Sequence, residues 1–137
     1  MSAALTIGYF FFYSFVGWLM DTSYRSILAR AFAPGSFFPV PMCPIYGFGA
    51  LLVIFLHRAF PSAPLVLQGL IYGVLLALLE YLTGYFALLF FHRRLWYYAG
   101  GWLNLGHFTD LSHAVLWGVG AIVLVSYLQP ALESVFR

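Results

Sequence analysis

Glu80 is the residue whose position says most about chemistry, because it is the one charged side chain in the apolar run from Leu65 to Phe91. An acidic side chain near the centre of a transmembrane helix costs about 2.5–3.5 kcal/mol on insertion scales. Such a residue must be satisfied by a partner. Two interpretations remain open from the sequence: a proton or ligand site, and a structural carboxyl that is ion-paired or hydrogen-bonded.

The helix face that carries Glu80 is indicated by its small neighbours. Steps of three or four residues connect Glu80 with Gly69, Gly73, Ala77 and Gly84. Residues at this spacing share one face of an α-helix, and small residues mark the faces on which membrane helices pack. We therefore predict that Glu80 points into protein and hydrogen-bonds another segment, with Arg94, Asn104 or Tyr46 as its partner.

Asp21 repeats this pattern near the end of the first apolar run. Tyr13, Gly17 and Asp21 are spaced by four residues and share a face, and Arg25 follows four residues later. A polar site and a helix cap or interfacial charge both fit this position. Arg25 is the expected local partner of the carboxylate.

The histidines raise the question of a cofactor. His107 and His113 flank Asp110, but their spacing matches no recognised zinc motif. Ligation of haem or another pigment by these two histidines is kept as an alternative. The single cysteine, Cys43, lies among apolar residues, which favours an inert buried thiol. A bound lipid or pigment is possible by composition, and no metal is expected.

Other chemistry has little support. Ser112 adjoins His113, but no acyl-transfer motif surrounds the pair. The chain has no Walker A loop, so it cannot hydrolyse ATP by itself. A net charge of +2 is too small to indicate nucleic-acid binding. Enzymatic activity is therefore not favoured.

The composition requires these residues to sit in membrane helices. Of 137 residues, 64% are hydrophobic and 7% are charged, whereas a soluble domain carries about 25% charged residues. We predict an all-α polytopic membrane helix bundle in one transmembrane domain, residues 1–137. At roughly 20 residues per span there is room for about four transmembrane helices.

Apolar runs place the expected spans at residues 5–20, 45–56, 65–91 and 111–128, the last ended by Pro130. Residues 21–33 could continue as an interfacial helix, and a local break near Thr83 and Gly84 is an open alternative. Residues 95–110 are rich in aromatic residues and Gly, which predicts an interfacial or re-entrant segment before the last span.

The termini and the arginines bear on membrane placement. The first residues lack the basic start of a signal peptide, so the first apolar run is expected to be retained. Four arginines on one side (Arg25, Arg30, Arg93, Arg94) against Arg58 and Arg137 favour both termini outside the cytoplasm. The expected location is the bacterial inner (cytoplasmic) membrane.

Motifs along nearly the whole chain resemble one family. They are Tyr13-Ser14-Phe15-Val16-Gly17-Trp18, Pro44-Ile45-Tyr46-Gly47, Glu80-Tyr81, Arg94-Leu95-Trp96-Tyr97-Tyr98, Asn104, Gly106, Trp117-Gly118 and Pro130. In order and spacing they resemble the CmpB-like integral membrane proteins described as "putative ABC-transporter type IV". The resemblance implies that five polar residues converge on one intramembrane pocket: Asp21, Tyr46, Glu80, Arg94 and Asn104.

The sequence departs from this family pattern at three places. Asp21 stands where Glu is usual, Tyr97 stands where Asp is usual, and Ala33-Pro34-Gly35 replaces Asn-Arg-Gly. Two expected charged positions are therefore lost.

Three functional hypotheses follow. The first is a small membrane protein associated with transport or lipid handling, which uses the polar pocket and works with partner chains in a homo- or hetero-oligomer. The second is a non-catalytic accessory subunit of a larger membrane complex that binds lipid, carotenoid or tetrapyrrole. The third is a membrane-embedded lipid-modifying enzyme.

Overall fold

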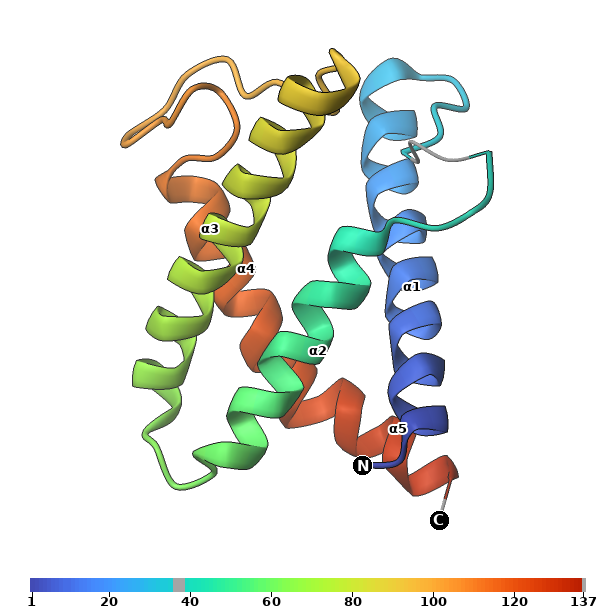
Figure 1. Ribbon diagram of the computed structural model, residues 1–137, viewed down its shortest axis with the longest axis vertical. Coiled ribbons are helices and arrows are strands. Elements are labelled where there is room, and N and C mark those ends of the chain that lie inside the picture. The colour runs from blue at the N-terminus through green and yellow to red at the C-terminus, as the bar shows by residue number, and fades with distance from the viewer. Residues whose placement is uncertain (36–38, 137) are drawn as a thin grey trace. The chain divides into compact units, whose positions relative to one another are not determined.

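The computed structural model describes residues 1–35 and 39–136, and this part of the chain is helical with irregular connections (Figure 1). The elements are α1 (Ala3–Ala29), α2 (Pro44–Ala59), α3 (Leu65–Phe91), α4 (Leu111–Val123), the π-helical turn η1 (Leu124–Leu128) and α5 (Gln129–Val135). The described residues contain no strand, only an isolated bridge between Leu105 and Thr109. The all-α prediction is confirmed. Part of the Pro-rich connection, residues 36–38, and Arg137, which enters the orientation argument, lie outside the described residues.

Among the residues that the structure describes, three helical stretches are long and apolar enough to cross a membrane: Ala3–Ala29, Leu65–Phe91 and Leu111–Val135. The fourth apolar helix, α2, has 16 residues, fewer than the roughly 20 that a full crossing needs. The protein is therefore an integral membrane protein with three long apolar spans and one shorter apolar helix.

The chain forms two compact units, Met1–Leu52 and Val53–Arg137, with α2 contributing residues to both. The prediction of a single domain stays a prediction. Each unit is described separately below.

In the first unit α1 is longer than predicted. It starts at Ser2, whose hydroxyl caps the helix by accepting from the Leu5 N–H, and it runs without a break to Ala29. The predicted span ended at about Met20, but the helix itself continues to Ala29, in the stretch 21–33 where the sequence allowed it to continue. No Pro or Gly interrupts residues 21–33, and the Asp21–Arg25 pair supports the helix across the expected boundary.

The start of α2 lies close against α1. A Cβ added at Gly47 would collide with the Ser14 hydroxyl, and one added at Gly17 would collide with the Tyr46 ring. The Cys43 N–H also donates to the Ser14 carbonyl oxygen at 3.0 Å. Two glycines therefore let these backbones approach, as small residues do between membrane helices.

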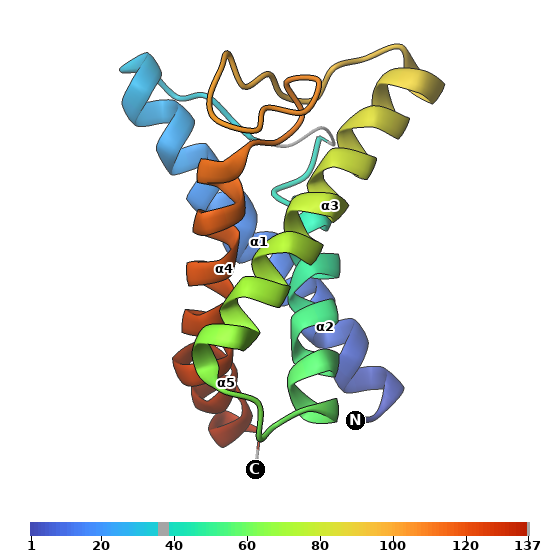
Figure 2. The same ribbon diagram turned by 90° about the vertical axis from the view of Figure 1, so that its left-hand side faces the viewer.

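In the second unit α3 and α4 cross each other (Figure 2), and glycines lie at their contact. A Cβ at Gly73 would lie 2.7 Å from the Ala114 carbonyl oxygen, and one at Gly118 would lie 2.7 Å from the Gly69 carbonyl oxygen. The core beside this crossing consists of Val53, Tyr72, Leu76, Ala121 and Val125. Helix α3 is continuous from Leu65 to Phe91, so the alternative with a break near Gly84 is not realised.

Pro130 does not end the last helix, contrary to prediction. The helix passes through the π-helical turn η1, in which the Gln129 N–H donates to the Leu124 carbonyl oxygen, and it continues as α5. Proline is tolerated in the first turn of a helical segment, where its missing N–H would be unpaired in any case. The wider turn before it makes Pro130 such a first-turn residue.

Residues 92–110 connect α3 to α4 without any helix, so the described chain has no fifth crossing there. The Tyr98 N–H donates to the His107 carbonyl oxygen, and the Leu111 N–H donates to the Trp102 carbonyl oxygen. These bonds satisfy part of the irregular backbone internally, as a low-water environment requires. That the segment is interfacial or re-entrant stays a prediction.

Candidate functional site

The second unit brings polar side chains together around Glu80, near the middle of α3. Glu80 is 4% exposed, as the small-residue stripe predicts. Its Oε1 atom accepts a 2.7 Å hydrogen bond from the hydroxyl of Tyr98 in the segment 92–110. The sequence hypothesis did not name Tyr98 as the partner.

The second carboxylate oxygen of Glu80 is also buried. Thr109 and Trp117 lie beside the carboxyl group, but within the described residues no well-directed hydrogen bond reaches Oε2, and the Thr109 hydroxyl is likewise buried without one. A buried oxygen in this state is costly unless a proton, a cation or a donor completes it. Oε2 of Glu80 is therefore the atom of this cluster most suited to interact with a ligand.

Tyr98 connects Glu80 to an aspartate–histidine pair. The Tyr98 ring stacks on the His113 ring with centroids 3.6 Å apart. The Nδ1 atom of His113 lies 2.7 Å from Oδ1 of Asp110. Since the carboxylate accepts, Nδ1 carries the hydrogen, and Nε2 of neutral His113 is left as the basic nitrogen.

Asp110 is held as a carboxylate. Burial acts to raise the pKa of Asp110, but hydrogen bonds from the His113 N–H, the Ser112 hydroxyl and the His113 ring outweigh it and lower this pKa to about 2. Asp110 also caps the N-terminus of α4, where a negative charge is stabilised by the helix dipole. The Ser112 hydroxyl donates to Asp110 Oδ1 at 2.7 Å and so helps to stabilise the carboxylate charge.

The position of Tyr98 is fixed by polar contacts within the segment 92–110. Its carbonyl oxygen accepts from Asn104 Nδ2 at 3.1 Å and lies 2.9 Å from His107 Nδ1. Asn104 also accepts from the His107 N–H. Asn104 and His107 therefore orient the residue that contacts Glu80 and do not contact the carboxyl themselves.

The same segment is anchored on α3 by Phe108. A Cβ at Gly84 would lie 2.7 Å from the Phe108 ring, and the rings of Tyr81 and Tyr85 pack edge-on against it. The Trp96 indole donates to the Phe108 carbonyl oxygen at 2.7 Å. Gly84 of the predicted stripe thus provides the space in which the segment packs.

Arg94 lies in this segment but is exposed. It donates to the Gly106 carbonyl oxygen, and its guanidinium lies 4.6 Å from the centroid of the Phe108 ring. A cation over an aromatic face is a stabilising contact. Arg94 therefore contributes to the fold of the segment, and its described contacts do not include Glu80.

The other two residues implied by the family resemblance belong to the first unit. Asp21 accepts from Arg25 Nε at 2.9 Å, and the half-buried Tyr46 packs on Gly17. That all five residues share one pocket stays a prediction. Burial and then the charge of Asp21 raise the pKa of the Cys43 thiol to about 11, against a smaller lowering by Arg25, which agrees with the interpretation of an inert thiol.

The histidine alternative stays a hypothesis. The Nδ1 atoms of His107 and His113 both face protein oxygens, which leaves Nε2 as the ring nitrogen that a cofactor would use. Within residues 1–35 and 39–136, no group of three or more His, Cys, Asp and Glu side chains is placed to hold a metal ion.

Sequence reasoning missed Tyr98, Thr109 and Asp110 as members of this cluster. The signal for Asp110 was present, since an aspartate directly before an apolar run is typical of a helix cap. No pattern in the sequence predicted which tyrosine of the Trp96-Tyr97-Tyr98 run faces Glu80.

A family model described as "Putative ABC-transporter type IV" matches residues 8–137. Curated proteins gave no match, and neither did solved structures. The match covers almost the whole chain and includes all residues of the Glu80 cluster, so the protein belongs to this family of membrane proteins.

Proposed function

We propose that this protein is a membrane-spanning component of a transport system, and that the Glu80 cluster is its working site. Family membership and three long apolar spans support the general assignment. One observation supports the site: a buried carboxyl within a span, with one oxygen hydrogen-bonded by Tyr98 and the other outside good hydrogen-bond geometry to the neighbouring Thr109 and Trp117. Such a carboxyl is suited to take up a proton or a cationic group.

The Asp110–His113 pair gives this site a second polar element. Tyr98 contacts both parts, by its hydroxyl to Glu80 and by its ring to His113. Proton transfer in membrane proteins uses such chains of Asp, Glu and His side chains. Uptake of a proton or cation at Glu80 would alter the hydrogen bond between Glu80 and Tyr98, and through Tyr98 it would affect the segment 92–110.

Partner chains are part of this proposal. Three long spans and a shorter apolar helix provide few walls for a solute pathway. Since the chain has no Walker A loop, any energy from ATP must come from another subunit. We expect the protein to bury at least about 1,000 Å² of surface in a contact with another membrane chain. We expect this complex to lie in the bacterial cytoplasmic membrane.

Purification from the native membrane tests the proposal. An affinity-tagged chain isolated in mild detergent together with its partner subunits is expected to show vanadate-sensitive ATPase activity. The chain separated from those partners is expected to lack this activity. Glu80→Gln is expected to lower this ATPase activity, or to weaken the dependence of the ATPase activity on the tagged membrane chain. Arg30→Gln, which neutralises an exposed side chain at the end of α1, outside the cluster, serves as the control.

Two results would overturn the proposal. One is a stable monomer without associated ATPase activity in several mild detergents and in amphipols. The other is a visible absorption band in the purified protein, which would favour the pigment-binding accessory subunit. Equal activity of the Glu80→Gln and Arg30→Gln proteins would remove the Glu80 cluster as the working site.

A further inference from the structure

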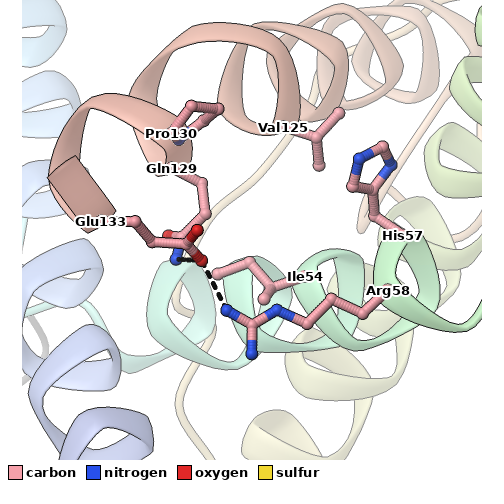
Figure 3. A pocket seen from close by; sticks show the side chains of 7 residues that line it. All are labelled: Ile54, His57, Arg58, Val125, Gln129, Pro130 and Glu133. Carbon is pink, nitrogen blue, oxygen red and sulfur yellow. Dashed lines mark hydrogen bonds and ion pairs between the residues drawn. The ribbon is translucent and has the colours of Figure 1, made fainter. Parts of the chain in front are cut away.

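A separate cavity of about 150 Å³, with polar and apolar walls, lies in the second unit, where the end of α2 faces η1 and α5 (Figure 3). It is lined by Ile54, His57, Arg58, Val125, Gln129, Pro130 and Glu133. One water occupies about 30 Å³ of liquid volume. The cavity therefore has room for a small polar group and not for an acyl chain.

The cavity carries one charge of each sign. Arg58 Nη2 donates to Glu133 Oε1, and Gln129 Nε2 donates to the same oxygen at 2.9 Å. The Arg58 and Glu133 side chains are 40% and 28% exposed, and pairs this open to solvent are held weakly. A guanidinium has five N–H donors, of which the described bonds of Arg58 use one.

His57 is a third polar group at the cavity, and its ring is held in place from behind. Its Nδ1 lies 2.8 Å from Gln68 Oε1, an oxygen that also accepts from the Tyr72 hydroxyl. Since that oxygen is an acceptor, Nδ1 carries the hydrogen and Nε2 remains for a ligand. The amide of Gln68 is fixed by its bond to the Ala63 carbonyl oxygen.

The cavity lies near the ends of two apolar helical stretches, and this position indicates which kind of ligand can reach it. His57 and Arg58 form the last turn of the apolar helix α2. Glu133 lies near the end of the apolar stretch Leu111–Val135. Ends of apolar helices lie at the level of the lipid head groups. The π-helical turn η1 directly precedes the helix that carries Gln129 and Glu133, and such turns are frequent at functional sites.

We propose that this cavity binds the head group of a zwitterionic aminophospholipid, with the phosphate on Arg58 and the primary ammonium on Glu133. The shared chemistry is a phosphate and an ammonium joined by a short linker. Arg58 can hold phosphate through two parallel N–H donors, and the carboxylate of Glu133 then pairs with the ammonium. A purely anionic head group would face Glu133 without compensation, and a choline head group has no N–H to donate.

Lipid retention on the purified full-length chain tests this site. Native mass spectrometry from micelles doped with equal amounts of phosphatidylethanolamine, phosphatidylcholine and phosphatidylglycerol is expected to show preferential retention of phosphatidylethanolamine. Glu133→Gln is expected to reduce this preference about three- to tenfold by removing the ammonium partner. Arg58→Gln is expected to reduce retention of both phosphatidylethanolamine and phosphatidylglycerol, and Arg58→Lys to restore it in part.

Arg30→Gln, which removes an exposed arginine from the end of α1, is the matched control and is expected to leave lipid retention unchanged. Circular dichroism and gel filtration of each variant separate lost binding from lost folding. Equal retention of the three lipids by the parent chain, or a Glu133→Gln protein with unchanged preference, would overturn the proposal. Displacement of the lipid by an equal concentration of soluble O-phosphoethanolamine would overturn the assignment to a membrane lipid.

Discussion

The Tyr98 hydroxyl donates a 2.7 Å hydrogen bond to Glu80 Oε1 and so connects an irregular segment to the middle of a membrane span. Glu80 would be costly in that position without a donor, and Tyr98 depends on Asn104 and His107 for its own placement. The stability of the segment 92–110 and the accommodation of the buried carboxyl are therefore coupled.

Tyr98→Phe tests this coupling. Removal of the hydroxyl leaves Glu80 Oε1 without this donor, so we expect the free energy of unfolding to fall by about 1–2 kcal/mol. Unfolding in dodecyl maltoside micelles measures the change. Tyr97→Phe, an identical substitution on the exposed neighbouring residue, is expected to be close to neutral.

Glu80 variants, combined with Tyr98→Phe, give a double-mutant cycle that measures the coupling between the two residues. Glu80→Gln keeps an oxygen acceptor for Tyr98 and is expected to be milder than Glu80→Leu, which removes it. The double variant Glu80→Leu/Tyr98→Phe is expected to lose less stability than the sum of its single variants, because the two share one interaction. Simple additivity would contradict the coupling.

Acid stability is expected to depend on Asp110. Its folded pKa of about 2 lies below the ordinary 3.8, so the ionised carboxylate contributes stability that is complete above about pH 4 and is lost as the pH falls toward 2. Thermal unfolding of the parent chain between pH 5 and pH 2 is expected to show this loss. Asp110→Asn is expected to flatten the profile, since it keeps a cap without a titrating carboxyl.

Asp110→Ala separates the cap from the charge. It removes both and is expected to lower the free energy of unfolding at pH 7 by about 0.5–2 kcal/mol. Ser112→Ala removes only one of the donors to Asp110 and is expected to cost less. An Asp110→Asn protein with the same pH profile as the parent would show that another carboxyl governs the acid transition.

Two glycines of α4 provide a matched pair for the helix crossing. Gly118→Ala places a Cβ 2.7 Å from the Gly69 carbonyl oxygen and is expected to destabilise the second unit by about 1–3 kcal/mol. A Cβ at Gly120 meets nothing within 4 Å, so Gly120→Ala is expected to be neutral or to stabilise by up to about 1 kcal/mol. Equal effects in unfolding experiments would place the crossing elsewhere.

The sequence predicted α3 well because its limits are physically sharp. Pro64 precedes the apolar run and His92 follows it, so the predicted range 65–91 agrees with Leu65–Phe91. The buried glycines and Glu80 also follow the predicted stripe, since helical periodicity fixes a face once the helix is known. Local rules were sufficient here.

The ends of α1 and of the last span were predicted less well. Polarity after Met20 resembles a membrane boundary, but polar residues can continue a helix beyond the membrane when no Pro or Gly breaks it. Pro130 resembles a terminator, yet a preceding π-helical turn makes it a first-turn residue. Such a turn depends on tertiary packing, which no pattern of a single sequence shows.

The partner of Glu80 could not be predicted for a related reason. The family resemblance indicated polar residues that belong together, but the path of an irregular segment decides which of them makes contact. Tyr98 reaches Glu80 because Phe108 packs at Gly84 and because Asn104 holds the Tyr98 carbonyl oxygen. These contacts are long-range consequences of the fold.

Leu103 provides the last prediction, because its backbone is strained and its side chain is exposed. Its φ is 54°, a left-handed conformation that costs bulky L-residues about 1–2 kcal/mol. Leu103 is 70% exposed, and the preceding residue, Trp102, is 84% exposed. Leu103→Asn is therefore expected to stabilise the isolated chain in detergent by about 0.5–1 kcal/mol, since Asn tolerates this conformation. Leu105→Asn, the same change in the same segment at a position without positive φ, is the control and is expected to give no gain.

Strain of this kind persists where a residue has another role, and contact with a partner chain is the role that our functional proposal requires. We accordingly expect Leu103→Asn to lower the yield of the complex from native membranes while it raises the stability of the isolated chain. A variant that neither stabilises the chain nor weakens the complex would contradict both the strain at Leu103 and its part in association.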